Sequence, residues 1–172
     1  MNSQVYNFYS DPLYVIGTNS NAFQSINGNF YSITASGLSV SIGGNTLIQL
    51  TNPSGTNKTL YLYKFILSTS GASTGLTITF IRNGTFPAPG TTLTPANTNF
   101  SSPLTSVATA KYGSGSPVGT TPILITVQSS QIYTEFIDSV IVMPPNTSLV
   151  IQISNTLLSI QTIAFSLFWY EV

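Results

Sequence analysis

The sequence predicts an all-β protein, a jelly-roll β-sandwich of about 8–10 antiparallel strands with an extended N-terminal arm. Apolar and polar residues alternate in many short segments, and clusters of Gly, Pro and Asn separate these segments. The clearest case is the run Leu76-Thr-Ile-Thr-Phe-Ile, in which Leu76, Ile78 and Phe80 share one face. No long segment has the period of a helix. Only 5% of the residues are charged, so the surface consists mainly of Ser, Thr, Asn, Gln and Tyr.

Segments rich in β-branched and aromatic residues are predicted to form the strands. In chain order they are Tyr31–Ala35, Leu38–Ile42, Thr46–Thr51, Thr59–Thr69, Leu76–Ile81, Thr105–Tyr112, Ile123–Tyr133, Ser139–Met143, Leu149–Ile153 and Ile163–Tyr170. The turn Gly43-Gly44-Asn45 lies between two of them and is typical of a hairpin. The Pro-, Gly- and Thr-rich stretch from Gly84 to Pro103 is expected to be a surface loop or an elaborated connection between strands.

Residues 1–28 are predicted to be an arm, and residues 29–172 the jelly-roll domain. The first 14 residues of the arm hold four aromatic residues among Asn and Ser: Tyr6, Phe8, Tyr9 and Tyr14. Twelve extended residues span about 40 Å. That length is enough to reach a neighbouring molecule and add a strand to its sheet, the arrangement called β-augmentation. An arm that folds back on its own domain, and an arm that is disordered, remain as alternatives. The polar tract from Asn19 to Gly28 carries few structural signals.

The strand at residues 59–67 is apolar on both faces, apart from Lys64. One face is expected to hold Leu60, Leu62 and Ile66, and the other Tyr61, Tyr63, Phe65 and Leu67. A strand in a sandwich needs only one apolar face. The second face is therefore covered either by a loop or the N-terminal segment, or by a neighbouring subunit, and the same holds for the last strand. The predicted subunit interface comprises Tyr6, Phe8, Tyr9, Tyr14, Tyr61, Tyr63, Phe65, Phe168 and Tyr170.

The composition removes most of the side chains that perform catalysis. The chain has four Lys and Arg, four Asp and Glu, and no His or Cys. A Ser–His or Cys–His arrangement is therefore impossible, and the usual zinc and iron ligands are missing. Glu135 and Asp138 are three residues apart, which places them on opposite faces of a strand and disfavours a shared calcium site. We expect no enzyme activity, no catalytic residue, no cofactor and no metal.

Charge and hydropathy also limit the partners. The four Lys and Arg residues are too few and too dispersed to form a phosphate-binding patch, so nucleic acid is not an expected partner. The apolar runs are far shorter than the ~20 residues of a membrane helix, and the first residues lack the basic and apolar regions of a secretory signal. We expect a chain made in the cytoplasm without a signal peptide and without a membrane partner. The net charge of zero favours association of the chain with itself.

The uncharged β-pattern is accompanied by two characteristic segments near the end of the chain, PPNTSLVIQIS (residues 144–154) and FSLFWYEV (residues 165–172). In these features the chain resembles small jelly-roll proteins of Bacillus-type spore surfaces. These are exosporium proteins with tumour-necrosis-factor-like heads and the subunits of endospore appendage fibres. The resemblance implies a structural subunit that self-assembles into an extracellular fibre on the spore surface. It also implies an arm that engages the next subunit, a homotrimer with aromatic residues on its three-fold axis, and an anchoring spore-surface protein as a further partner.

The resemblance has one departure. Several appendage subunits use N-terminal Cys for cross-links, and this chain has no Cys, so a fibre of it would be held by packing and arm exchange.

Two other functions stay open. The stretch LTPANTNFSSPLTSVATA (residues 93–110) resembles bacteriophage structural proteins, which implies a capsid decoration or tail component located in the virion. A carbohydrate-binding module is the other alternative, with Tyr61, Tyr63, Trp169 and Tyr170 as platforms on which sugars stack.

Overall fold

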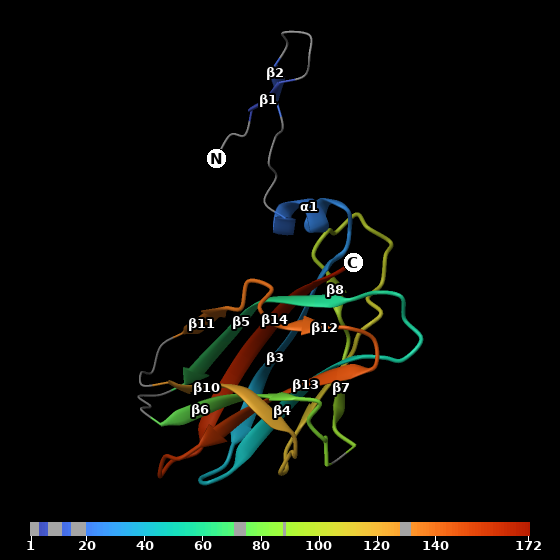
Figure 1. Cartoon of the computed structure of the whole chain (residues 1–172). Coiled ribbons are helices and arrows are strands. Elements are labelled where there is room, and N and C mark those ends of the chain that lie inside the picture. The colour runs from blue at the N-terminus through green and yellow to red at the C-terminus, as the bar shows by residue number, and fades with distance from the viewer. Residues whose placement is uncertain (1–3, 7–11, 15–19, 71–74, 88, 128–131) are drawn as a thin grey trace.

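Two antiparallel β-sheets pack face to face, and one short helix lies at an end of the sandwich (Figure 1). The computed structural model describes residues 4–6, 12–14, 20–70, 75–87, 89–127 and 132–172. Among these residues the only helix is α1 (Ser20–Ile26). The prediction of an all-β sandwich is confirmed.

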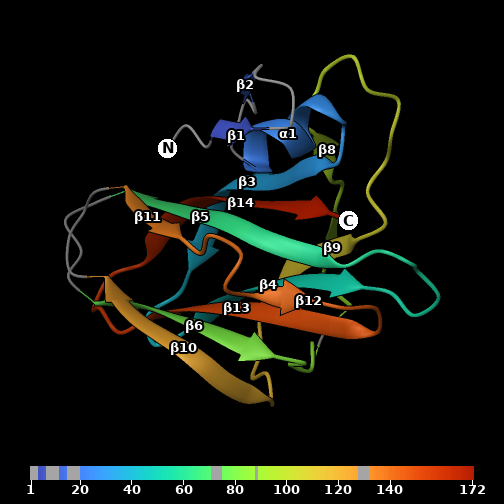
Figure 2. The same cartoon turned by 45° about the horizontal axis from the view of Figure 1, so that its top comes forward.

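The first layer, which we call sheet I, has the strand order β10-β6-β13-β4-β9-β7. Its strands are β4 (Asn45–Asn52), β6 (Leu76–Arg82), β7 (Thr91–Leu93), β9 (Thr109–Gly113), β10 (Thr120–Val127) and β13 (Thr147–Asn155). The second layer, sheet II, has the order β11-β5-β14-β3-β8, with β12 beside β5. Its strands are β3 (Phe30–Val40), β5 (Leu60–Ser70), β8 (Ala96–Asn97), β11 (Tyr133–Phe136), β12 (Val142–Met143) and β14 (Gln161–Glu171). Figure 2 shows β5 and β14 in one layer and β13 and β10 in the other.

The long strands pair in a nested order. β3 pairs with β14, β4 with β13, β5 with β11 and β6 with β10, always antiparallel. From β3 to β6 each successive strand therefore lies in the other sheet, and the partner strands β10, β11, β13 and β14 alternate between the sheets in the same way. As a result β14 lies between β3 and β5 in sheet II, and β13 lies between β4 and β6 in sheet I.

The core fills the space between the sheets and follows the alternation read from the sequence. On β14 the inward residues Ile163, Phe165, Leu167 and Trp169 are buried. On the neighbouring strand β5 of the same sheet, Phe65 stacks near Phe165 with ring centroids 6.4 Å apart. Burial of each such large apolar side chain stabilises the fold by about 1.5–3 kcal/mol. Because these side chains point into the core, the residues of β14 that alternate with them lie on the outer face of sheet II.

Two predicted strands form the single strand β3. The register with β14 shifts between the pairs Ala35–Phe165 and Leu38–Ile163. The bulge contains Gly37, whose φ of 69° lies in the left-handed region that glycine adopts without a steric penalty. The break predicted between Ala35 and Leu38 is therefore a β-bulge within one strand.

Other predicted strands differ in extent or partner. The segment at 123–133 divides between β10 of sheet I and β11 of sheet II, the segment at 105–112 is a strand only from Thr109, and the one at 139–143 only at Val142–Met143. The turn at 43–45 does not close a hairpin, because β3 and β4 lie in different sheets. The stretch from Gly84 to Pro103 is an elaborated connection that holds β7 and β8. Such short strands bring the two large sheets to six strands each in the described part of the chain, above the predicted number.

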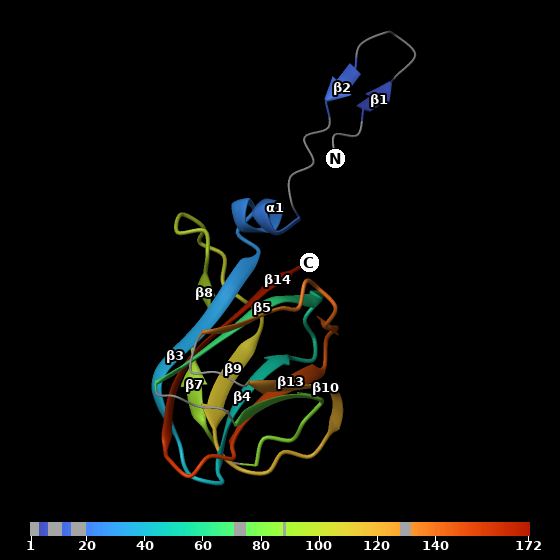
Figure 3. The ribbon, with the colours of Figure 1, turned by 90° about the vertical axis from the view of Figure 1, so that its left-hand side faces the viewer.

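The N-terminal region contains both a separate hairpin and a docked helix. β1 (Gln4–Tyr6) and β2 (Pro12–Tyr14) form a two-stranded antiparallel sheet of their own. α1 packs on the sandwich, where the Ser25 and Thr98 hydroxyls lie 3.2 Å apart and the Asn99 side-chain amide donates to the Ile26 carbonyl at 3.0 Å. Figure 3 shows α1 at the end of β3, close to the connection that holds β8. Part of the predicted arm is therefore packed against the sandwich.

Candidate interaction surface

An aromatic cluster occupies one end of the outer face of sheet II. On β14, Phe168 and Tyr170 point away from the core because they alternate with inward-facing residues. β5 places Tyr61 directly opposite Tyr170, and on the other side of β14 the residue opposite Tyr170 is Phe30 of β3. Tyr61, Phe168 and Tyr170 are partly exposed, whereas Phe30 is buried among its neighbours. The face is therefore a continuous aromatic surface rather than a set of isolated rings.

The rings of this cluster contact one another in favourable geometries. Tyr61 and Tyr170 stack with centroids 5.0 Å apart and planes inclined by 7°. Phe30 stacks on Tyr170 at 6.4 Å and meets Tyr63 edge to face at 5.6 Å. Ring pairs at these separations contribute about 0.5–1.5 kcal/mol beyond the area they bury. The rings therefore stabilise one another's positions within a single chain.

Two polar groups border the aromatic cluster. The Lys64 ammonium lies 5.2 Å from the centroid of the Phe168 ring, a cation–π contact. The hydroxyls of Ser139 and Tyr170 lie 2.9 Å apart, within hydrogen-bond distance. Both contacts hold partly exposed side chains in place at the border of the cluster.

The prediction that Phe65 lies on this outer face is wrong. The register of β5 with β14 shifts between the pairs Lys64–Phe168 and Leu62–Trp169, so that Tyr63 is an extra residue on β5. The bulge reverses the alternation, and Phe65 points into the core with no exposed surface. Four of the predicted interface residues, Tyr61, Tyr63, Phe168 and Tyr170, do share the outer face. Phe30 also belongs to the cluster and was not predicted. Its position directly before the strand predicted from Tyr31 could have placed it on this sheet.

The predicted interface residues of the arm are placed only in part. Tyr6 lies in β1 and Tyr14 in β2, where Tyr6 is opposite Pro12 and Tyr14 is opposite Gln4. Phe8 and Tyr9 lie outside the described residues.

The outer face of sheet I differs, because the chain covers it. Leu47, Ile81 and Val150 form a second, outward-facing apolar cluster that is almost fully buried beneath Phe86. The Lys111 ammonium lies 4.4 Å from the centroid of the Phe86 ring, a cation–π contact. The connection after β6 therefore covers the apolar cluster on the outer face of sheet I, while the aromatic cluster of sheet II stays partly exposed.

Trp169 does not offer a sugar platform, which corrects one of the carbohydrate-binding residues named above. It has no exposed surface, and its indole N–H donates to the Glu171 carboxylate at 3.1 Å. Glu171 is itself fully buried and also accepts from the Ser106 hydroxyl and the Val107 amide. Burial raises the pKa of the nearby Tyr31 hydroxyl above its usual range, and the negative charge of Glu171 raises it further. Through these bonds the Glu171 carboxylate holds the segment before β9 against β14.

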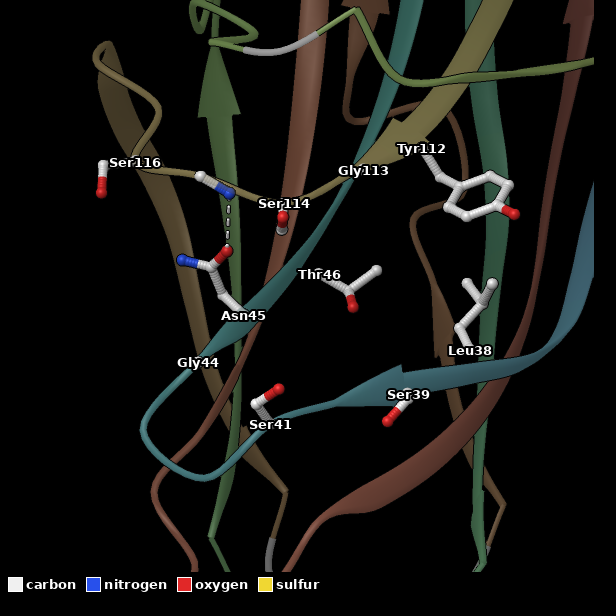
Figure 4. A pocket seen from close by; sticks show the side chains of 11 residues that line it. Leu38, Ser39, Ser41, Gly44, Asn45, Thr46, Tyr112, Gly113, Ser114 and Ser116 are labelled. Carbon is white, nitrogen blue, oxygen red and sulfur yellow. Dashed lines mark hydrogen bonds between the residues drawn. The ribbon is translucent and has the colours of Figure 1, made fainter.

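A polar pocket of about 490 Å³ opens at the opposite end of the sandwich, between the end of β3, the start of β4 and the segment after β9 (Figure 4). Sequence reasoning gave no sign of it, since its lining consists of common residues from three distant segments. Within the described ranges, no group of three or more His, Cys, Asp or Glu residues could hold a metal ion. The described part of the chain also has no helix long and apolar enough to cross a membrane.

Comparison with known proteins adds no relative. No family model matches the chain. No curated protein and no solved structure matches it either.

Proposed function

We propose that this chain is a structural subunit that self-assembles, with the aromatic outer face of sheet II as the contact between copies. The observation that carries the proposal is the cluster of Tyr61, Tyr63, Phe168 and Tyr170 on the outer face of sheet II, which the described residues leave partly exposed. Contiguous apolar surface of this kind marks sites of protein association, and aromatic residues are enriched at the centres of interfaces. The zero net charge of the chain favours the same outcome.

The nested strand pairing supports a jelly-roll topology for the head. A jelly roll is a double-sheet sandwich in which the chain is wound so that early strands pair with late ones. The pairs β3–β14, β4–β13, β5–β11 and β6–β10 follow that scheme. The jelly roll agrees with the resemblance to spore-surface heads and fibre subunits, which motivates the more specific proposal of a homotrimer built into an extracellular spore-surface fibre.

The decisive experiment measures assembly of variants of the aromatic face. Tyr61→Ser combined with Tyr170→Ser is expected to shift the protein from oligomer to monomer in light scattering coupled to size exclusion, and to abolish regular particles in negative-stain electron microscopy. Phe100→Ser is the matched control, because Phe100 is a fully exposed aromatic residue outside the cluster. A parent chain that is monomeric at every concentration, or a double variant that assembles like the parent, would contradict the proposal.

The arm is proposed to link one head to the next. Deletion of residues 1–16 leaves α1 and its contacts with the sandwich intact. The truncated protein is expected to form soluble, discrete heads and no filaments. Filaments of unchanged length and abundance would remove the arm from the proposal while leaving the aromatic contact untouched.

A further inference from the structure

We propose that the pocket between β3, β4 and the segment after β9 is a binding site for a neutral sugar. This inference does not rest on the proposed self-assembly, because the pocket is formed within one chain. Its lining comes from residues 38–41, 44–46 and 112–116, three segments that the fold brings together where the space between the sheets opens to solvent.

The chemistry of the lining selects an uncharged, hydroxyl-rich ligand. No charged residue lines the pocket, so neither an anion nor a cation finds a counter-charge there. Five Ser and Thr side chains do line it: Ser39, Ser41, Thr46, Ser114 and Ser116. Figure 4 shows Ser41, Thr46 and Ser114 around one open space, with Leu38 and Tyr112 at one end. A sugar ring presents hydroxyls at its edge and C–H groups on its faces, and this mixture of hydroxyls with one apolar end matches both.

Thr46 is the residue that points most directly to a ligand. It follows the inward alternation of β4, is only 5% exposed, and lines the pocket. Within the part of the chain that the structure describes, its hydroxyl makes no hydrogen bond to another residue, and that oxygen is not among the buried polar atoms without a partner, so it is accessible from the pocket. Because the fold does not use this hydroxyl, it can both donate to a ligand and accept from one. Valine has nearly the same shape and lacks the hydroxyl.

The backbone around the pocket is held in place from inside the sandwich. The side-chain amide of buried Asn155 donates to the carbonyls of Val40 and Ser41, at 3.0 and 3.2 Å, and the Asn155 backbone N–H donates to the carbonyl of Gly44 at 2.9 Å. On the other wall, the Asn45 side-chain carbonyl accepts from the Gly115 amide at 3.2 Å. The hydroxyls are therefore mounted on segments whose positions are set before a ligand binds, which lowers the entropy cost of binding.

The size of the pocket agrees with the same ligand class. Pockets for small molecules measure about 300–1,000 Å³, and this one measures about 490 Å³. The serines at the rim are exposed. When the bound sugar belongs to a longer glycan, the rest of that glycan can therefore extend from the pocket into solvent.

Saturation-transfer difference NMR tests the proposal on the full chain, whether it is a single subunit or an assembly. The probes are D-glucose, D-galactose and N-acetylglucosamine, with tert-butanol as an apolar control. At least one sugar is expected to receive saturation at its ring protons. Thr46→Val is expected to weaken that sugar's binding roughly fivefold, the value of one neutral hydrogen bond, while its melting temperature stays close to the parent's.

Thr79→Val provides the matched control, since Thr79 lies partly buried on β6 and does not line the pocket. This variant is expected to bind the sugar as the parent does. The proposal is overturned if none of the three sugars receives saturation, if tert-butanol binds as strongly as the sugars, or if Thr46→Val and Thr79→Val have the same effect. Because the readout is on the ligand and the aromatic face is not altered, failure here leaves the self-assembly proposal standing.

Discussion

The Tyr61 ring stacks on the Tyr170 ring at 5.0 Å across the boundary between β5 and β14. Because the pair is partly exposed on the outer face of sheet II, its attraction contributes to the sandwich and also prepares a flat aromatic surface. A double-mutant cycle with Tyr61→Ala and Tyr170→Ala, followed by urea unfolding of each variant, is expected to give a coupling energy of about 0.5–1.5 kcal/mol. The measurement requires conditions in which all four proteins are monomeric. A coupling energy of zero would contradict the stacked geometry.

Glu171 should contribute strongly to stability although it lies near the end of β14. Its Oε1 accepts from Trp169 and Ser106, and its Oε2 accepts from Val107. Glu171→Ala leaves all three donors without this acceptor and is expected to lower the free energy of unfolding by about 2–4 kcal/mol. Glu171→Gln keeps one oxygen and loses one bond, so its expected cost is about 1–2 kcal/mol. Asp138→Asn is the control, since Asp138 is exposed.

The stability of the fold should fall at alkaline pH through Tyr31. Its pKa in the folded protein is raised by burial and by Glu171, so the folded state keeps a proton that the unfolded state releases above about pH 10. The stabilisation is fully present below that pH and is lost as the pH rises toward the folded-state pKa. Urea unfolding at neutral and strongly alkaline pH should show a smaller alkaline loss for Tyr31→Phe than for the parent. An identical loss in both proteins would count against this assignment.

Asn155 should be another position with a large effect on stability. Its side-chain amide donates to the carbonyls of Val40, Ser41 and Ser159, and its side-chain carbonyl accepts from the Leu157 amide. Asn155→Ala is expected to lower the free energy of unfolding by about 2–4 kcal/mol. Ser154→Ala, at the partly exposed neighbouring position, is expected to change it by less than about 0.5 kcal/mol. Thermal or urea denaturation compares the two.

The sequence predicted those elements whose alternation is uninterrupted. β6, β13 and β14 were located because each has a regular inward row, such as Ile163 to Trp169. The errors occurred at bulges, since one extra residue reverses the direction of every later side chain. A break was predicted between Ala35 and Leu38, where β3 is continuous, and Phe65 was placed outside instead of inside. The polar pocket could not be predicted, because its lining comes from three segments that only the fold brings together.

The outer faces of sheet I and sheet II differ in how much apolar surface they expose, and this difference affects how an assembly of subunits grows. The connection that carries Phe86 covers the apolar cluster of sheet I, whereas the aromatic cluster of sheet II stays partly exposed. In the proposed homotrimer the aromatic clusters meet around one three-fold axis, so that this contact closes a ring and is fully used within it. A ring cannot lengthen through the contact that made it. Extension into a filament then requires a second, chemically separate contact along the ring axis, so that ring closure and filament elongation become two steps that mutations can uncouple.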